Sequence, residues 1–425
     1  MKVHHASRPA PLVLLTMLAL ALLLLAPAVA SASLKSGITS LLQRHGMAGS
    51  GTSVAVFDLT AKKYLYSLRP DVLRLPASNE KLVTSSTALA SWTATYRFST
   101  QVFIDAPGPD EDGIVRGNLY LRGLGDPTFS TASFADRHWH MTTGDVQDLV
   151  RAVRKLGVTR VTGRVVADEG YFDALRSVTN WRPSMSAYCA PLSALTLNES
   201  SASGGGYVTD PALAAAASLT RRLRAAGIRV AHGPAHGVAP ITATLACSER
   251  SARLGRILAA MNKPSDNFLA EELLKGLGAG FGPGGTTAAG AGVAKAFLGS
   301  IGVSGGFRLR DGSGLSYRDR LSARVVLKIL GAMARRDDYR VFRRSLAVAG
   351  VDGTLKHRMR GTAAAGNVRA KTGTLNDASS LSGYVTTSNG HLLSFSMLMN
   401  GHPVNVTRAH AAQDAVAALL ARSRP

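Results

Sequence analysis

The sequence is poor in cysteine and in acidic residues, and each shortage excludes a class of protein. Only two cysteines, Cys189 and Cys247, occur among 425 residues, and neither has the neighbouring ligands that a metal site needs. Asp and Glu number 27 against 49 Lys and Arg, which gives a formal net charge of +22. Because the basic residues are scattered and are not grouped with aromatic residues, we expect no nucleic-acid partner.

Long hydrophobic runs are equally scarce. The run from residue 11 to residue 26 follows two basic residues and precedes a small-residue segment, 28–30, which is the three-part pattern of a secretory signal peptide. Its length of about 15 residues falls short of the roughly 20 that cross a bilayer. We therefore predict that a signal peptide, residues 1–30, is cleaved after Ala30 and that the protein is exported to the periplasmic or cell-wall space. A retained membrane anchor is the alternative.

Export bears on the cysteines and on the excess positive charge. An oxidising compartment allows a disulfide between Cys189 and Cys247, and the sequence leaves both the paired and the free state open. A basic exported protein is attracted to anionic wall polymers, to anionic membrane surfaces and to carboxylate-bearing peptides. We expect this attraction to be weak, because a solvated surface accounts for much of the charge.

The secondary-structure pattern changes twice along the chain. Residues 51–68 alternate as two strands do, and an apolar helical period follows them. Between residues 98 and 240, short strands alternate with loops rich in Gly, Pro and Asp, before helical patterns return. The simplest architecture is an α/β (α+β) domain made of residues 34–97 and 241–425, with a strand-rich second domain inserted at 98–240.

Three short motifs occur in order along the sequence. "SNEK" contains Ser78 and Lys81, "SDN" contains Ser265 and Asn267, and "KTGT" begins at Lys371. Each motif alone is weak evidence, since a lone S-x-x-K is usually a polar helix face. The ordered set of three, each in a plausible structural context, is a strong indication of one chemistry.

These residue types suit acyl transfer by an activated serine. Residues three apart share a helix face, so Lys81 can reach Ser78 and take its proton. A lysine acts as a base only when its neutral form is accessible, which burial and a second cation such as Lys371 would favour. Ser265 could relay a proton to the leaving amine, and Asn267 could bond both Lys81 and a substrate carbonyl.

The residues after Lys371 are candidates for substrate binding. Thr372, Gly373 and Thr374 lie on an expected strand, which suits a substrate peptide laid along a sheet edge. The backbone N–H groups of Ser78 and Thr374 could form an oxyanion hole, where one donor contributes roughly 3–4 kcal/mol to related reactions.

The three motifs and longer segments around them resemble one family. The segments "PASNEKLVT", "GNLYLRGLGDPTF", "YCAPLSALTLNES", "MNKPSDNFLAEELLK" and "DGSGLSYRDR" are similar to the D-alanyl-D-alanine carboxypeptidase/endopeptidase family, the low-molecular-mass class C penicillin-binding proteins. The resemblance implies a penicillin-binding/β-lactamase-like transpeptidase fold with an inserted domain. It also implies an acyl-enzyme on Ser78, peptidoglycan stem peptides as substrates and β-lactam antibiotics as inhibitors.

Three alternatives remain to be tested. A β-lactamase of this fold needs a deacylating base, but Ala194 stands where class A enzymes place a Glu before a Leu-Asn pair. A non-catalytic peptidoglycan-binding protein would be expected to have lost at least one motif residue. A metal enzyme is disfavoured because His138 and His140 lack a third ligand at suitable spacing. We expect no metal, no cofactor and activity that survives a chelator.

Two other segments are interpreted as structural. "DGSGLS" at Asp311–Ser316 is typical of a tight turn that needs glycine. Glu80 lies inside the first motif and could act as a base, but its position on a helix would point it away from Ser78 and Lys81.

Overall fold

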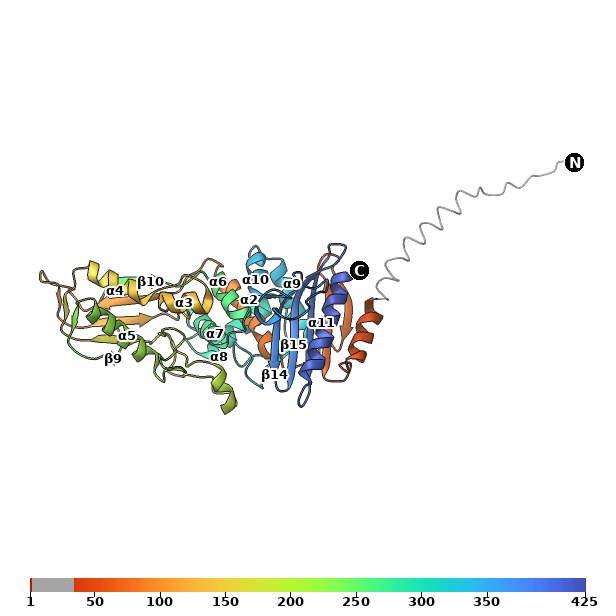
Figure 1. Ribbon diagram of the computed structural model, residues 1–425, viewed down its shortest axis with the longest axis horizontal. Helices are drawn as coiled ribbons and strands as arrows, with labels where there is room; N and C mark the ends of the chain where they lie inside the picture. Colours follow the sequence, from red (N-terminus) through yellow and green to blue (C-terminus); the bar gives the residue numbers. More distant parts are fainter. Residues whose placement is uncertain (2–33) are drawn as a thin grey trace.

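The computed structural model describes Met1 and residues 34–425. Apart from Met1, the predicted signal peptide and its cleavage point lie outside the described residues. Within the described part, no helix combines the length and the apolar character needed to cross a membrane. The chain forms an elongated molecule with a sheet towards each end and a helical region between them (Figure 1).

A six-stranded antiparallel sheet combines the two ends of the described chain. Its order is β13-β14-β15-β16-β1-β2, and β1 pairs with β16 from Thr52↔Met399 to Asp58↔Leu393. Segments from before and after the middle of the chain therefore share one sheet. The strands are β1 (Thr52–Asp58), β2 (Lys63–Leu68), β13 (Ala347–Val348), β14 (Arg369–Leu375), β15 (Ala378–Thr386) and β16 (Leu392–Asn400).

Alternate residues of this sheet pack on opposite faces, as the two-residue period of a strand requires. Phe395 and Met397 join a buried cluster with α11 (Val406–Arg422) and with the helical residues 34–44. Leu398 joins the cluster of the helical region on the other face. The helices there are α2 (Lys81–Ser91), α6 (Leu254–Asn262), α7 (Asn267–Phe281), α8 (Thr287–Ser300), α9 (Ala323–Ala334) and α10 (Tyr339–Ser345).

A five-stranded sheet of order β10-β3-β5-β7-β9 has a separate buried cluster with α4 (Val146–Lys155) and α5 (Pro211–Ala225). β10 lies beyond residue 240, which is the predicted end of the inserted domain, and it pairs with β3 along its length. The division into two domains stays a prediction. The strands are β3 (Ser99–Ile104), β5 (Leu119–Gly123), β7 (Val165–Asp168), β9 (Ala235–His236) and β10 (Thr244–Arg250).

Short elements connect these layers. A three-stranded sheet and a two-stranded sheet lie outside the two main sheets, and three 3-10 turns occur in the described chain. These elements are β4 (Ile114–Val115), β6 (Arg160–Val161), β8 (Arg229–Val230), β11 (Phe307–Arg308), β12 (Arg320–Leu321), α3 (Ala132–Trp139), η1 (Ala77–Glu80), η2 (Pro183–Tyr188) and η3 (Gly353–Leu355).

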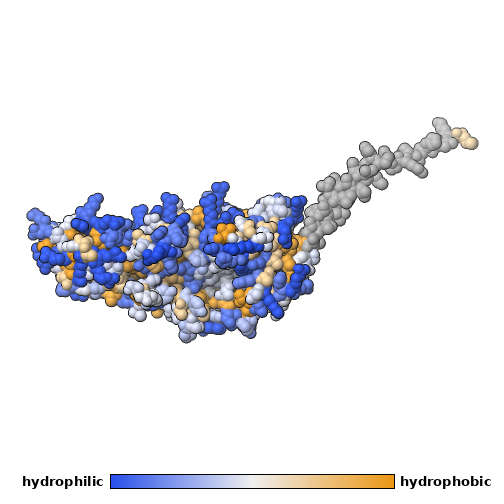
Figure 2. All heavy atoms as spheres, viewed as in Figure 1, coloured by the Kyte–Doolittle hydropathy of each residue, from blue (hydrophilic) through white to orange (hydrophobic). Residues whose placement is uncertain are grey.

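The two cysteines are free thiols in different parts of the molecule. Cys189 belongs to the helical cluster, whereas Cys247 lies on β10 against the cluster of the five-stranded sheet. The disulfide that export would allow is therefore absent from the described chain, because each thiol packs in its own core. On the face shown in Figure 2, hydrophilic residues predominate and hydrophobic residues form small patches.

Candidate active site

The first motif lies where a 3-10 turn runs into a helix. Ser78 is in η1, and Lys81 is the first residue of α2. Ser78 is thus near a helix start, as expected, but on the tighter turn that precedes it. In this arrangement Lys81 Nζ donates a hydrogen bond to Ser78 Oγ at 3.1 Å.

The Lys81 ammonium has three hydrogen-bond acceptors, which matches its three N–H groups. Besides Ser78 Oγ, it donates to Asn267 Oδ1 at 2.7 Å and to the backbone carbonyl of Ser313 at 2.7 Å. The Lys81 side chain is completely buried. Its position is therefore fixed by α2, by the start of α7 and by the loop that contains Ser313.

Burial of the Lys81 ammonium lowers its pKa to about 8, whereas the charges of Asp311 and Glu271 favour the protonated form. Lys371 is also completely buried. Burial, followed by the nearby charge of Lys81, lowers the pKa of Lys371 well below its usual range. Loss of solvation is thus the main cause of the lowered Lys81 pKa, whereas the sequence also predicted an effect of Lys371.

The second motif forms the start of α7. Asp266 caps this helix by accepting a hydrogen bond from the Leu269 N–H at 2.8 Å. Asn267 bonds Lys81 through its oxygen, and its amide nitrogen donates to the Tyr188 carbonyl at 2.9 Å. Ser265 has a left-handed backbone, with φ of 71°, and lines the same cavity as Ser78.

The third motif lies on β14, which packs closely against η1. A Cβ on Gly373 would lie 2.9 Å from both the Ser78 nitrogen and the Pro76 oxygen, so only glycine allows this approach. The Asn79 side chain donates to the Lys371 carbonyl at 3.1 Å, and Lys371 Nζ donates to the Thr372 carbonyl at 2.9 Å. Segments far apart in the sequence therefore meet here.

One edge of β14 is largely free of strand neighbours. β13 pairs only with Arg369 and Ala370, whereas β15 covers the other edge along the whole strand. Thr372, Gly373 and Thr374 line a cavity of about 480 Å³ together with Ser78, Ser265 and Asn267. The three predicted motifs therefore converge on one cavity, with the two lysines buried beneath its surface.

The loop Asp311–Ser316 is a part of the site that its interpretation as a turn missed. Asp311 accepts hydrogen bonds from the Gly314 and Ser316 N–H groups, both at 2.7 Å. Glu271 accepts from the Ser313 N–H at 2.8 Å. These hydrogen bonds hold the loop so that the Ser313 carbonyl faces Lys81. The sequence Asp-Gly-Ser-Gly predicted a tight turn, but it could not predict that two acidic side chains bond the N–H groups of this turn.

Comparison with known families identifies this arrangement. Residues 34–205 and 200–423 match the pattern of the D-Ala-D-Ala carboxypeptidase 3 (S13) family. The chain belongs to this family. It is a serine D-Ala-D-Ala carboxypeptidase, so the predicted family and enzyme class are confirmed.

Similar proteins cover most of this S13 carboxypeptidase. It is 32% identical to a D-alanyl-D-alanine carboxypeptidase of Actinomadura sp. (strain R39), over 98% of this chain and 90% of the relative. It is 31% identical to carboxypeptidase DacB of Mycolicibacterium smegmatis, over 81% of this chain and 75% of that relative. Penicillin binding protein 4 (dacB) of Haemophilus influenzae has the same fold, with a TM-score of 0.74 at 20% identity over 89% of this chain and 97% of that one. The predicted fold class is confirmed.

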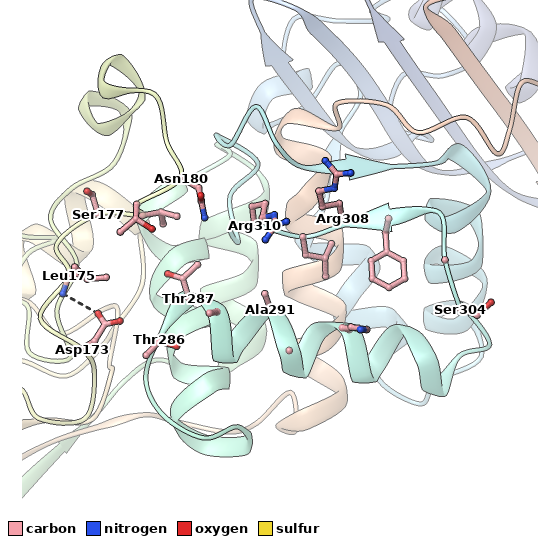
Figure 3. A pocket seen from close by; sticks show the side chains of 18 residues that line it. Asp173, Leu175, Ser177, Asn180, Thr286, Thr287, Ala291, Ser304, Arg308 and Arg310 are labelled. Atoms are coloured by element: carbon pink, nitrogen blue, oxygen red, sulfur yellow. Dashed lines mark hydrogen bonds between the residues drawn. The ribbon is translucent and has the colours of Figure 1, made fainter.

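A larger cavity, of about 620 Å³, lies away from the three motifs of the S13 enzyme. It is bounded by the segment 173–180, by α8 and by the segment 304–310 (Figure 3). None of the motif residues lines it. Size alone therefore does not locate the catalytic cavity in this molecule, whereas the Lys81–Ser78 contact does.

Glu80 is a poor candidate for the base in this S13 enzyme. Its side chain is buried, and one carboxyl oxygen has no hydrogen-bond partner among the described residues. Burial, then the charges of Asp311 and Glu271, raise its pKa well above the usual range. A protonated carboxyl group that does not line the catalytic cavity cannot take a proton from Ser78.

The Gly314→Ala substitution is expected to slow acylation about tenfold or more and to lower the melting temperature. Gly314 has φ of 83°, and a Cβ would lie 1.9 Å from the Ala77 oxygen. The left-handed backbone alone costs about 1–2 kcal/mol, and relief of the clash would displace η1 or the Ser313 carbonyl. Small displacements in a catalytic site cost large factors in rate. Stopped-flow acylation by a chromogenic cephalosporin and thermal unfolding measure the two effects.

Gly366→Ala is the matched control for this substitution. Gly366 has φ of 71°, but a Cβ there would meet nothing within 4 Å. We expect it to lose only the backbone term of about 1–2 kcal/mol and to acylate at the wild-type rate. Equal acylation rates for Gly314→Ala and wild type would show that the loop does not position the site.

Proposed function

We propose that the enzyme cleaves the terminal D-Ala from peptidoglycan stem peptides, and also D,D-cross-links, through an acyl-enzyme on Ser78. The observation that carries this proposal is the 3.1 Å hydrogen bond from Lys81 Nζ to Ser78 Oγ, with the Lys81 pKa lowered to about 8. An accessible neutral amine beside a hydroxyl is the arrangement that activates a serine. The excess positive charge and the predicted export are consistent with a wall substrate.

Acylation begins when neutral Lys81 takes the Ser78 proton as Oγ attacks the carbonyl carbon of the penultimate D-Ala. The backbone N–H groups of Ser78 and Thr374 stabilise the oxyanion. Collapse of the tetrahedral intermediate breaks the C–N bond, and the leaving amine takes the proton from Lys81. Ser265 lines the cavity and relays this proton.

The third motif would hold the end of the substrate. Thr372 and Thr374 line the cavity on β14, and Lys371 lies beneath it. Burial lowers the pKa of Lys371, but an arriving carboxylate favours the protonated form of a nearby lysine. Substrate binding would thus restore the positive charge that attracts the terminal carboxylate. The free edge of β14 accepts the peptide backbone.

Penicillin would acylate Ser78 in the same way, and the resulting acyl-enzyme would be hydrolysed slowly. Among the described residues that line the cavity there is no Asp, Glu or His, so a carboxylate base for rapid hydrolysis of the acyl-enzyme is missing at its surface. The crystal structure of the Haemophilus influenzae protein complexed with a β-lactam is a related case of ligand binding on this fold. The lack of a carboxylate base at the cavity surface favours the peptidase over a β-lactamase.

Purified muropeptides test the substrate proposal. With pentapeptide monomers and D,D-cross-linked dimers, we expect release of free D-Ala from the monomers and conversion of dimers to monomers, both blocked by prior treatment with penicillin. Mass analysis of the products resolves the two reactions. Unchanged dimers in a sample that releases D-Ala would contradict the endopeptidase activity alone, and no release from either substrate would contradict the whole proposal.

A further inference from the structure

Three ligand-type side chains from distant parts of the chain meet beside the second motif. His138 is in the last turn of α3, Glu199 is in the loop between η2 and α5, and Asp266 caps α7. One ligand atom from each lies within 4.8 Å of the others, and His138 Nε2 is 3.1 Å from Glu199 Oε2. The sequence showed no further ligand near His138, because its two neighbours come from segments about 60 and 130 positions away along the chain.

Two carboxyl groups and a single imidazole meet in this cluster. Glu199 is 7% exposed, and its Oε1 is buried without a hydrogen-bond partner among the described residues. Within the described chain, neither Glu199 nor Asp266 forms an ion pair with a lysine or arginine, despite the large basic excess. Buried carboxylates are usually paired with cations or coordinate metals.

We propose that His138, Glu199 and Asp266 bind one divalent transition-metal ion, with Zn²⁺ as the best match. Imidazole nitrogen and carboxylate oxygen are both zinc ligands, and water would complete the coordination. Zinc–ligand distances of about 2.0–2.2 Å place two tetrahedral ligands about 3.3 Å apart. The 3.1 Å separation of His138 Nε2 and Glu199 Oε2 is close to this value. The His138 side chain is 49% exposed, which leaves an entry path for the ion.

A second cluster shows why the first one is chosen. Glu169, Asp210 and His236 also bring ligand atoms within 4.8 Å of one another. However, the guanidinium of Arg176 bonds Glu169 at 2.7 Å and lies 3.8 Å from Asp210. A cation therefore already balances those carboxylates, and an added metal ion would have to displace it.

The proposed ion stabilises the structure and takes no part in the acyl transfer. None of its three ligands lines the catalytic cavity. It would fasten α3 and the loop 198–200 to the residue that caps α7, next to Asn267, which bonds Lys81. We therefore expect acylation of Ser78 to persist in the stripped enzyme, as anticipated from the sequence, while the stability changes.

Zinc titration of the untagged, metal-stripped full chain tests this proposal. We expect calorimetry to show saturable Zn²⁺ binding by the wild type. The His138→Ala and Glu199→Gln variants should each bind one Zn²⁺ equivalent fewer. Saturating Zn²⁺ should raise the melting temperature of the wild type by about 3–6 °C and should not raise that of these variants. His140→Ala is the matched control, because His140 caps α3 but is outside the cluster. It should bind zinc as the wild type does.

The rival arrangement is a proton shared between Glu199 and Asp266, which needs no metal. Absence of saturable Zn²⁺ binding to the wild type, or equal binding by His138→Ala and Glu199→Gln, would overturn the proposal. Thermal unfolding without metal shows whether each variant is folded. Labelling by fluorescent penicillin in the same samples reports Ser78 chemistry independently, so failure of the metal site is distinguishable from failure of the proposed function.

Discussion

Replacement of Ser78 by alanine is expected to abolish covalent labelling by a fluorescent penicillin and to reduce D-Ala release by about 10⁴-fold or more. The acyl-enzyme requires a bond from Ser78 Oγ to the substrate carbonyl, and alanine has no such oxygen. Ser78 Oγ receives a hydrogen bond from Lys81, so its removal leaves Lys81 with two of its acceptors. In-gel fluorescence and intact-protein mass measure the outcome.

Ser86→Ala provides the matched control for this result. Ser86 is a buried serine on α2, and its hydroxyl donates to the Leu82 carbonyl at 2.6 Å, away from Lys81. We expect this variant to be labelled as the wild type is. Labelling that persists in Ser78→Ala would identify another nucleophile. Rapid hydrolysis of the penicilloyl-enzyme in the wild type would instead favour a β-lactamase, and no labelling would favour a non-catalytic protein.

The sequence predicted the parts of the site that are encoded by short local spacing. Ser78 and Lys81 are one turn apart, so their contact follows from local geometry once the segment folds as a helical turn. The ordered motifs also predicted that Asn267 and Lys371 belong to the same site. Their convergence depends on β14 packing against η1, which Gly373 permits.

Features that depend on the rest of the tertiary structure were not predictable in this way. The Ser313 carbonyl reaches Lys81 because Glu271 and Asp311 hold its loop, and backbone carbonyls carry no sequence signature. The dominant role of burial in the Lys81 pKa is likewise a property of packing. The separation of the two cysteines reflects two cores whose membership the sequence pattern did not resolve.

Replacement of Lys81 by methionine is expected to slow penicillin acylation by about 10²–10⁴-fold, the usual contribution of a general base. Methionine fills similar space without a titratable group. Because the neutral lysine is the active form, kcat/KM of the wild type should rise with pH, about tenfold per pH unit at low pH, and level off above about pH 8, the Lys81 pKa. The residual rate of the variant should lose this rise. Stopped-flow acylation across a pH series measures both.

Lys275→Met separates loss of the base from loss of a buried lysine. Lys275 lies on α7, the helix that begins with Asn267, and is 1% exposed. Its ammonium forms an ion pair with Asp173 at 2.6 Å. Its substitution leaves Asp173 without this partner and should lower stability, but the pH profile should keep its wild-type shape. If Lys81→Met instead retained the rise near pH 8, the titrating group would be another residue. The 3.1 Å contact with Ser78 would then position the hydroxyl without deprotonating it.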